Sequence, residues 1–350
     1  MTTQITKAFG ADSSDKPMHA LEITRRSLLA HDVEMDILYC GICHSDLHAV
    51  KNDWGNTDYP LVPGHEIIGK ITSVGEHVTK FKIGDIAAIG CIVDSCNSCE
   101  YCEDDLEQFC DEGVTYSFGS PDKVSGGNTF GGFSESYVCN EQYVLKMPSF
   151  DNLAAAAPLL CAGITVYSPL KHWQVSGKKI GVLGMGGLGH VAIKIAKAMG
   201  AEVVVFTRSE SKLEDAKRLG ADEVVLSTDQ AQMESYARKL HFILDTVSAK
   251  HDINAYLNLL KHDGSVVVVG LPPEPIEVNA FSIVNGRRSV SGSNIGSIAE
   301  TQEMLEFCAQ HNIAAEVELI NIHQVNEAFE RLEAGDVRYR FVVDMASLKS

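Results

Sequence analysis

The chain has 350 residues, of which 45 % are hydrophobic and 22 % charged, as expected for a globular protein long enough to form two domains. Its formal net charge of -18 at pH 7 excludes nucleic acid and anionic membranes as expected partners, because both require a basic surface. The sequence shows neither a membrane-spanning apolar run nor a secretion signal, so we expect a cytoplasmic protein whose ten cysteines are reduced.

The first 150 residues contain short apolar segments separated by glycine, proline and aspartate, a pattern typical of an irregular antiparallel β region. Strands are expected at residues 33–40, 65–74, 85–89 and 133–145. The glycine-rich stretch 113–132 is expected to be a loop.

Four cysteines of this region follow the spacing C-x2-C-x2-C-x7-C. They are Cys96, Cys99, Cys102 and Cys110. A tetrahedral zinc ion binds four thiolates at about 2.3 Å each, and a short loop that returns on itself can supply them. In a chain with reduced cysteines this cluster predicts a structural zinc site, and redox sensing is the alternative.

A second set of metal-ligand types is spread along the chain. It consists of Cys43, His65, Glu66 and Cys161. Two cysteines and one histidine with an open fourth position are typical of catalytic zinc, and Asp46 is placed to hold the far nitrogen of the histidine. The alternatives are that Cys161 is a small core residue and that His65 is a packed histidine.

After Pro158 the pattern changes to strands that alternate with helices, which predicts a doubly wound parallel sheet covered on both faces. Strands are expected at residues 179–183, 202–206, 224–226, 242–245 and 265–269. Helices are expected at residues 188–199, 211–219, 231–239 and 253–260.

The first strand of this region is followed by a G-x-G-x-x-G turn that opens a helix. Its residues are Gly184, Met185, Gly186, Gly187, Leu188 and Gly189. The glycines permit a tight turn, close backbone approach to a pyrophosphate and close helix–strand packing. The free N–H groups of the helix N-terminus favour phosphate, so the turn predicts dinucleotide binding. The alternative is a glycine-rich turn in an unrelated doubly wound fold.

The end of the second strand distinguishes NAD from NADP. An acidic residue there binds the ribose 2′-hydroxyl of NAD, whereas a basic one accommodates the 2′-phosphate of NADP. This chain has no acid at that point but offers Thr207, Arg208, Ser209 and Lys212, and Glu210 lies past the strand end. These residues favour NADP, and the alternative is a solvated loop.

Beyond residue 293 we expect helices at 299–310 and 325–334 and a strand at 340–344. From their pattern alone, they could extend the doubly wound domain or return to the first domain.

Six stretches together resemble the zinc-dependent medium-chain alcohol dehydrogenases, and most closely the cinnamyl alcohol dehydrogenase branch with its microbial NADPH-dependent aldehyde reductases. They are residues 41–48, 59–66, 96–110, 157–163, 184–189 and 336–341. The resemblance implies a fold of class α/β plus β. A GroES-like catalytic domain (1–150) would be followed by a Rossmann domain (151–293), and residues 294–350 would return to the first. It also implies a homodimer.

The resemblance also implies residue roles. Cys43, His65 and Cys161 would bind the catalytic zinc, with Glu66 as an alternate ligand. Ser45 and His48 would relay a proton between the reacting oxygen and solvent, and His44 and Arg340 would lie near the cofactor pyrophosphate. The substrate pocket would include Trp54, Cys91, Thr115, Asn294 and Ile295. Thr115 and Asn294 replace the bulkier aromatic residues of plant members, which favours broad aldehyde specificity.

The expected activity is therefore NADP(H)-dependent interconversion of aldehydes and primary alcohols, with aromatic aldehydes favoured by an aromatic pocket wall. Three alternatives are an NAD-dependent enzyme, a reductase of another bond such as an iminium, and a zinc-containing, NADP-binding redox sensor that is not an enzyme.

Overall fold

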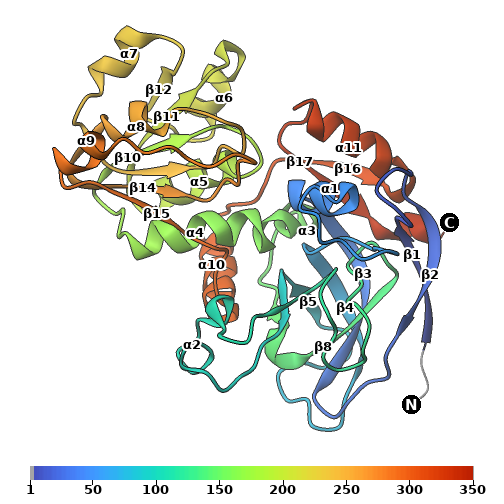
Figure 1. Ribbon diagram of the computed structural model, residues 1–350. Coiled ribbons are helices and arrows are strands. Elements are labelled where there is room, and N and C mark those ends of the chain that lie inside the picture. Colours follow the sequence, from blue (N-terminus) through green and yellow to red (C-terminus); the bar gives the residue numbers. More distant parts are fainter. Residues whose placement is uncertain (1–3, 350) are drawn as a thin grey trace. The chain divides into compact units, whose positions relative to one another are not determined.

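A computed structural model describes residues 4–349, which form two compact units (Figure 1). Unit 1 consists of residues 4–161 and 297–349, and unit 2 consists of Ala162–Gly296. The chain therefore leaves unit 1 once and returns to it. The observed boundaries follow Cys161 and Gly296, rather than residues 150 and 293 as expected from the sequence.

Unit 1 is built on a mainly antiparallel sheet with the strand order β16-β17-β3-β4-β5-β9, in which β8 also pairs with β3. Its strands are β3 (Asp32–Ile42), β4 (Ile67–Val74), β5 (Ile86–Ile89), β8 (Ser136–Asn140), β9 (Leu145–Lys146), β16 (Val317–Asn321) and β17 (Arg340–Asp344). Val33 and Met35 of β3 are completely buried. In Figure 1 the blue strand β3 lies with the red strand β17, so a late segment of the chain completes a sheet that begins early.

Two strands of this sheet differ from the sequence prediction. The segment 133–145 is not one strand, because the Asn140 side chain accepts a hydrogen bond from the Gln142 N–H and starts a 3-10 turn between β8 and β9. Strand β4 begins at Ile67, so His65 and Glu66 lie in the irregular segment before it. The first difference arises from a local hydrogen bond that hydrophobic periodicity does not reveal.

The short helix α3 (Leu153–Ala156) explains why the first boundary falls after Cys161. It packs against β3, β16 and β17, and the Ala155 carbonyl accepts a hydrogen bond from the Ala315 N–H at 3.0 Å. Residues 151–161 therefore belong to the core of unit 1. The C-terminal segment contributes helices α10 (Ile298–Gln310) and α11 (Val325–Glu333) to the same unit.

The remaining regular elements of unit 1 include a hairpin of two strands and short elements around the metal-ligand residues. They are β1 (Gln4–Gly10), β2 (His19–Arg25), α1 (His44–Lys51), β6 (Ile92–Asp94), α2 (Glu100–Glu103) and β7 (Thr115–Tyr116). Helix α1 is absent from the sequence prediction, because its eight residues are too few for a clear helical period.

Unit 2 is a doubly wound domain whose sheet is entirely parallel, in the order β12-β11-β10-β13-β14-β15. Its strands are β10 (Lys179–Leu183), β11 (Glu202–Thr207), β12 (Glu223–Leu226), β13 (Leu240–Asp245), β14 (Leu260–Val268) and β15 (Ser289–Gly292). Its helices are α4 (Ala162–His172), α5 (Gly189–Ala198), α6 (Leu213–Arg218), α7 (Gln230–Ser235), α8 (Ile253–Leu257) and α9 (Ala280–Val284). The predicted combination of a β-rich domain with a doubly wound parallel sheet is confirmed.

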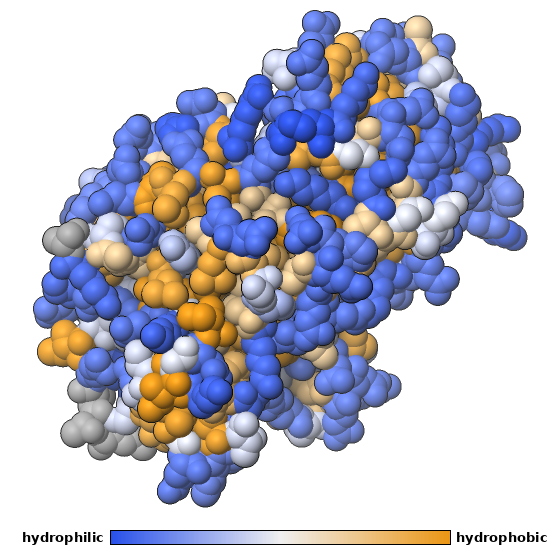
Figure 2. All heavy atoms as spheres, turned by 180° about the vertical axis from the view of Figure 1, so that it is seen from behind, coloured by the Kyte–Doolittle hydropathy of each residue, from blue (hydrophilic) through white to orange (hydrophobic). Residues whose placement is uncertain are grey.

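Hydrophilic side chains cover most of the face of the molecule seen in Figure 2, with apolar patches between them. Within residues 4–349 no single helix is long and apolar enough to cross a membrane. Only the bent pair Leu153–Leu160 and Ala162–His172 reaches that length and hydropathy when its two parts are taken together.

Candidate active site and metal centres

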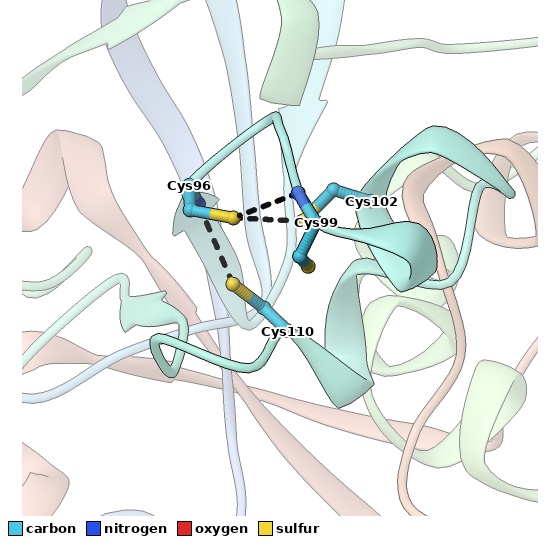
Figure 3. Close-up of side chains that lie close together, drawn as sticks. All are labelled: Cys96, Cys99, Cys102 and Cys110. Atoms are coloured by element: carbon cyan, nitrogen blue, oxygen red, sulfur yellow. Dashed lines mark hydrogen bonds between the residues drawn. The ribbon is translucent and has the colours of Figure 1, made fainter.

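The four-cysteine lobe brings its thiols together in unit 1 (Figure 3). All four sulfur atoms lie within 4.8 Å of one another, and the Sγ atoms of Cys96 and Cys102 are 3.8 Å apart. Four thiolates at about 2.3 Å from a tetrahedral zinc ion would be separated by about 3.8 Å, so the cluster fits this ion.

Backbone donors support the thiolate form of this cluster. The N–H of Cys99 donates to Cys96 Sγ at 3.3 Å, and the N–H of Cys96 donates to Cys110 Sγ at 3.5 Å. Backbone N–H groups, first among them that of Ser98, lower the pKa of the Cys96 thiol. Because a zinc ligand must be deprotonated, these contacts prepare the loop for the metal.

The second set of ligand types forms a buried cluster in unit 1, although its members are far apart in the sequence. The ligand atoms of Cys43, His65, Glu66 and Cys161 lie within 4.8 Å of one another, and the two Sγ atoms are 4.0 Å apart. Cys43 lies between β3 and α1, His65 and Glu66 directly precede β4, and Cys161 follows the 3-10 turn Ala157–Leu160. Pairing of β3 with β4 joins the first two of these segments.

Asp46 links two ligands of this cluster. One carboxylate oxygen accepts from the Cys43 N–H at 2.8 Å, and the other is 3.0 Å from His65 Nδ1 and accepts from the Gly64 N–H at 2.9 Å. The side chain of Asp46 is completely buried. A carboxylate at Nδ1 keeps the proton on that nitrogen and leaves Nε2 of His65 as the metal ligand. The predicted supporting role of Asp46 matches this geometry.

Glu66 provides the test of whether a cation fits the site. Its Oε1 accepts from Arg340 at 2.5 Å, whereas its buried Oε2 has no hydrogen-bond partner among the described residues. A Cβ atom at Gly41 would lie 1.9 Å from Oε2, so only glycine leaves room for this carboxylate. Burial raises the pKa of Glu66 to about 7, against the opposing effect of Arg340. An unpaired carboxylate oxygen beside two thiols and an imidazole is suited to a zinc ion.

Arg340 is a buried residue that contacts the metal cluster. Its side chain is 3 % exposed, and it donates to the Ile42 carbonyl at 2.8 Å as well as to Glu66. The structure therefore places the Arg340 guanidinium next to the metal cluster, where its charge balances Glu66. Its position near the cofactor pyrophosphate remains a prediction.

The two residues predicted to relay a proton, Ser45 and His48, both lie on α1. Ser45 Oγ is 3.8 Å from Cys43 Sγ, and His48, one turn further along α1, has its Nδ1 at 2.7 Å from Asp53 Oδ2. Helix α1 ends at Asn52 in the left-handed conformation, and the returning chain places the Asp53 N–H on the His48 carbonyl at 3.0 Å. The sequence analysis missed Asp53, because only this turn brings it back to His48.

The glycine-rich turn of unit 2 joins β10 to α5 as predicted. Gly184 has φ 83°, and a Cβ atom at Gly189 would lie 2.2 Å from the Gly184 carbonyl oxygen. A Cβ atom at Gly186 would meet no atom within 4 Å, so this turn leaves open space above it. The turn and the N-terminus of α5 together have the geometry of a pyrophosphate site.

The basic residues after β11 lie next to this turn. Leu183 at the end of β10 pairs with Phe206, and Lys212 Nζ donates to the Met185 carbonyl at 3.0 Å. The Thr207 hydroxyl accepts from the Ser209 N–H at 3.2 Å, and Arg208 is exposed. The residues predicted to bind the 2′-phosphate therefore lie at the end of β11 and directly after it. The end of the strand itself carries no acidic residue.

Comparison with known proteins agrees with both units. Residues 30–149 match the alcohol dehydrogenase GroES-like domain, and residues 187–310 match the zinc-binding dehydrogenase domain. The chain is 52 % identical to aldehyde reductase YahK of Escherichia coli, over 98 % of this chain and 99 % of the relative. It belongs to the zinc-binding alcohol dehydrogenase family. NADP-dependent alcohol dehydrogenase C 1 of Mycolicibacterium smegmatis is also 52 % identical, with the same coverage.

Two solved alcohol dehydrogenase structures share this fold throughout. A cinnamyl alcohol dehydrogenase of Sorghum bicolor is 44 % identical with a TM-score of 0.95, covering 98 % of each chain. The structure of CAD from Helicobacter pylori complexed with NADP(H) is 40 % identical with a TM-score of 0.93, covering 99 % of each chain. The predicted family is therefore confirmed.

The substrate-pocket residues predicted for this alcohol dehydrogenase fall in both units. In unit 1 the Cys91 thiol lies beside that of Cys161, and the Cys91 carbonyl accepts from the Ser117 N–H at 2.8 Å. Thr115 is buried in the same segment, and Trp54 is 49 % exposed near His48, with ring centroids 5.5 Å apart. Asn294 and Ile295 belong to unit 2.

A further aromatic residue beside the metal cluster, Phe118, was not predicted. Its ring centroid is 5.6 Å from that of His65. It lies in the glycine-rich stretch 113–132, which sequence patterns identify only as a loop.

His44 is exposed at the first position of α1.

Proposed function

We propose that this protein is a zinc-dependent, NADP(H)-dependent alcohol dehydrogenase that interconverts aldehydes and primary alcohols by hydride transfer. The observation that carries the proposal is the buried Cys43, His65 and Cys161 set with the unpaired Glu66 carboxylate oxygen beside it. A closed four-cysteine site alone is typical of structural zinc. The second, three-ligand set is the kind that keeps a position for water or substrate.

The residues of the chain have separate tasks in this reaction. When bound, zinc supplies Lewis-acid polarisation of the carbonyl oxygen and the dinucleotide supplies the hydride. The Ser45 hydroxyl exchanges a proton with the reacting oxygen, and His48 passes that proton to or from solvent. Asp53 holds the Nδ1–H of His48, which leaves Nε2 for proton exchange.

Preference for NADP(H) is supported by Arg208 and Lys212 together with the hydroxyls of Thr207 and Ser209. A 2′-phosphate is a dianion for which a guanidinium provides paired donors. Several relatives carry NADP dependence in their names, and the Helicobacter pylori structure contains NADP(H). The relative YahK is named for aldehyde reduction and supports that direction of the reaction.

We further propose aromatic and cinnamyl-type aldehydes as substrates, with aliphatic aldehydes accepted. Phe118 and Trp54 provide flat apolar surfaces near His65 and His48, and such rings favour a planar substrate. The small Thr115 side chain favours broad specificity over a strict phenylpropenyl fit.

The test compares NADPH with NADH in cinnamaldehyde reduction by zinc-replete protein. We expect kcat/KM to be about 100-fold higher with NADPH, and Arg208→Ala to lower this preference about tenfold by removing a charged partner of the phosphate. Arg218→Ala, in the exposed part of α6, is the matched control and should leave the preference unchanged. Turnover that favours NADH would contradict the assigned dinucleotide. Absence of turnover across aromatic and aliphatic aldehydes would contradict the enzymatic function.

We also propose a cytoplasmic homodimer. All ten cysteines are free, and Phe281 and Val284 of α9, beside the edge strand β15, are each 74 % exposed. Apolar side chains at a sheet edge favour pairing with a second copy. Sedimentation equilibrium should give about twice the 38.0 kDa chain mass, and Phe281→Glu should shift it toward the monomer. A single-chain mass for the unaltered protein would exclude the dimer.

A further inference from the structure

Asp245 is a buried carboxylate at the end of β13, outside the residues that the proposed reaction uses. Its register partner on β10 is Leu183, so it lies next to the start of the glycine-rich turn. One carboxylate oxygen accepts from the Val247 N–H at 3.1 Å, and the other is 2.8 Å from His251 Nε2. The Asp245 side chain is completely buried, and that of His251 is 16 % exposed.

The hydrogen bonds of His251 determine its protonation state. Nδ1 lies 2.9 Å from the Ala249 carbonyl oxygen, and Nε2 faces the Asp245 carboxylate. Both partners can only accept hydrogen bonds, whereas a neutral imidazole has one donor nitrogen. Only the doubly protonated imidazolium satisfies both contacts, so His251 forms an ion pair with Asp245 that closes the loop 246–251.

This loop packs directly on the glycine-rich turn. The Thr246 hydroxyl donates to the Leu183 carbonyl at 2.6 Å. A Cβ atom at Gly184 would lie 3.1 Å from both Thr246 Oγ1 and a Val247 methyl, and one at Gly189 would lie 3.4 Å from Thr246 Oγ1. The loop is therefore the support that sets the position of the phosphate-binding turn.

The other charged and titratable groups near His251 include Asp252, Tyr256 and the ion pair of Lys250 with Glu274. Asp245 is the main cause of the raised pKa of His251, and Asp252 adds to it, while burial acts against it. The Tyr256 ring of α8 has its centroid 6.0 Å from that of His251, and Arg208 is the cation that acts on Tyr256.

We propose that protonated His251 is a positioning residue for the dinucleotide, and that binding weakens when its imidazolium loses a proton. The ion pair with Asp245 holds loop 246–251 against the glycine-rich turn, and loss of the proton breaks one of the two hydrogen bonds that His251 makes. This inference rests on the proposed function, because it assigns a role in NADP(H) binding. His251 acts through the loop, with no contact to the reacting atoms required.

The direction of the pH effect follows from the pKa of His251, which is higher in the folded protein than in the unfolded chain. The ion pair contributes its full stability below the unfolded value of about 6.5 and loses it as the pH rises through the higher folded pKa. NADPH affinity should follow the same course. His251→Gln lacks the imidazolium charge at every pH. Titration of NADPH itself changes Kd equally in both proteins, so the ratio of the variant's Kd to that of the unaltered protein reports only the effect of the imidazolium.

The experiment measures Kd for NADPH by nucleotide fluorescence between about pH 6 and about pH 9. We expect His251→Gln to raise Kd about tenfold at the acid end, with the ratio approaching one at the alkaline end. The matched control is His262→Gln, because His262 is an exposed histidine of the same unit, and its ratio should be one throughout. Thermal unfolding verifies that each variant is folded.

Asp245→Asn is the second variant, usable even where His251→Gln does not fold. An Asn oxygen can still accept from Val247, and its amide N–H can donate to neutral His251, so this variant should bind NADPH better as the pH rises. A pH-independent Kd ratio for His251→Gln, or an unchanged pH profile for Asp245→Asn, would overturn the role of the imidazolium. Failure of the unaltered protein to bind NADPH at any pH would instead overturn the proposed function, and this inference with it.

Discussion

Replacement of Cys161 by serine should remove one zinc ion per chain and lower kcat/KM for aldehyde reduction about 1,000-fold. Cys161 supplies one of the two thiolates of the three-residue set, and its Sγ is 4.0 Å from that of Cys43. A serine hydroxyl stays protonated at neutral pH and is a poorer zinc ligand than a thiolate. Lewis-acid stabilisation contributes several kcal/mol to the transition state, and each 1.36 kcal/mol is about tenfold in rate.

Two measurements on this variant separate metal loss from unfolding. Zinc content by elemental analysis should fall from two ions to one per chain, while the circular dichroism spectrum stays that of the folded protein. Cys308→Ser is the matched control, since Cys308 is a buried cysteine of α10 that belongs to neither ligand set and has its Sγ 3.6 Å from Met304 Sδ. It should keep both zinc ions and activity within about twofold. Full zinc content and full activity in Cys161→Ser would contradict the assignment of the catalytic set.

Replacement of Cys99 by serine should release the other zinc ion and lower the stability of the protein by about 4 kcal/mol or more. Cys99 is the N-cap of α2, a helix of four residues none of which is buried. Tyr101 and Phe109 of the same lobe are 40 % and 48 % exposed. A segment with so little buried apolar surface depends on metal binding for its folded structure.

The measurement is thermal unfolding together with zinc content. For a chain of this size the expected loss of stability lowers Tm by roughly 5 °C, whereas kcat of the protein that remains folded should change little. Ser98→Ala is the control in the same turn, because the exposed Ser98 contributes its backbone N–H and keeps that group as alanine. An unchanged Tm in Cys99→Ser would show that the lobe folds without its metal.

The features that could be predicted from the sequence are those whose residues lie close together along the chain. The four cysteines of the lobe span one loop, and the glycine-rich turn lies between a strand and a helix that are both visible as apolar periodicity. The resemblance added the ligand set of Cys43, His65 and Cys161, which spacing alone does not connect.

Other features depended on contacts between distant segments. The Ala155–Ala315 hydrogen bond places residues 151–161 in unit 1, and the left-handed Asn52 turn brings Asp53 to His48. Neither contact leaves a periodic signal.

The sequence by itself therefore determined the four-cysteine set and the residue types at the dinucleotide turn, because short motifs have a chemistry that depends on local spacing. It determined the family and the second ligand set through the resemblance of six stretches taken together. The tertiary structure decided which charges meet. Arg340 and Glu66 are paired because β17 lies next to β3, and Asp245 and His251 are paired because a loop closes on the end of β13. Burial makes such pairing obligatory, since a charge removed from water is stable only beside a partner, and only the folded chain determines which partner is within reach.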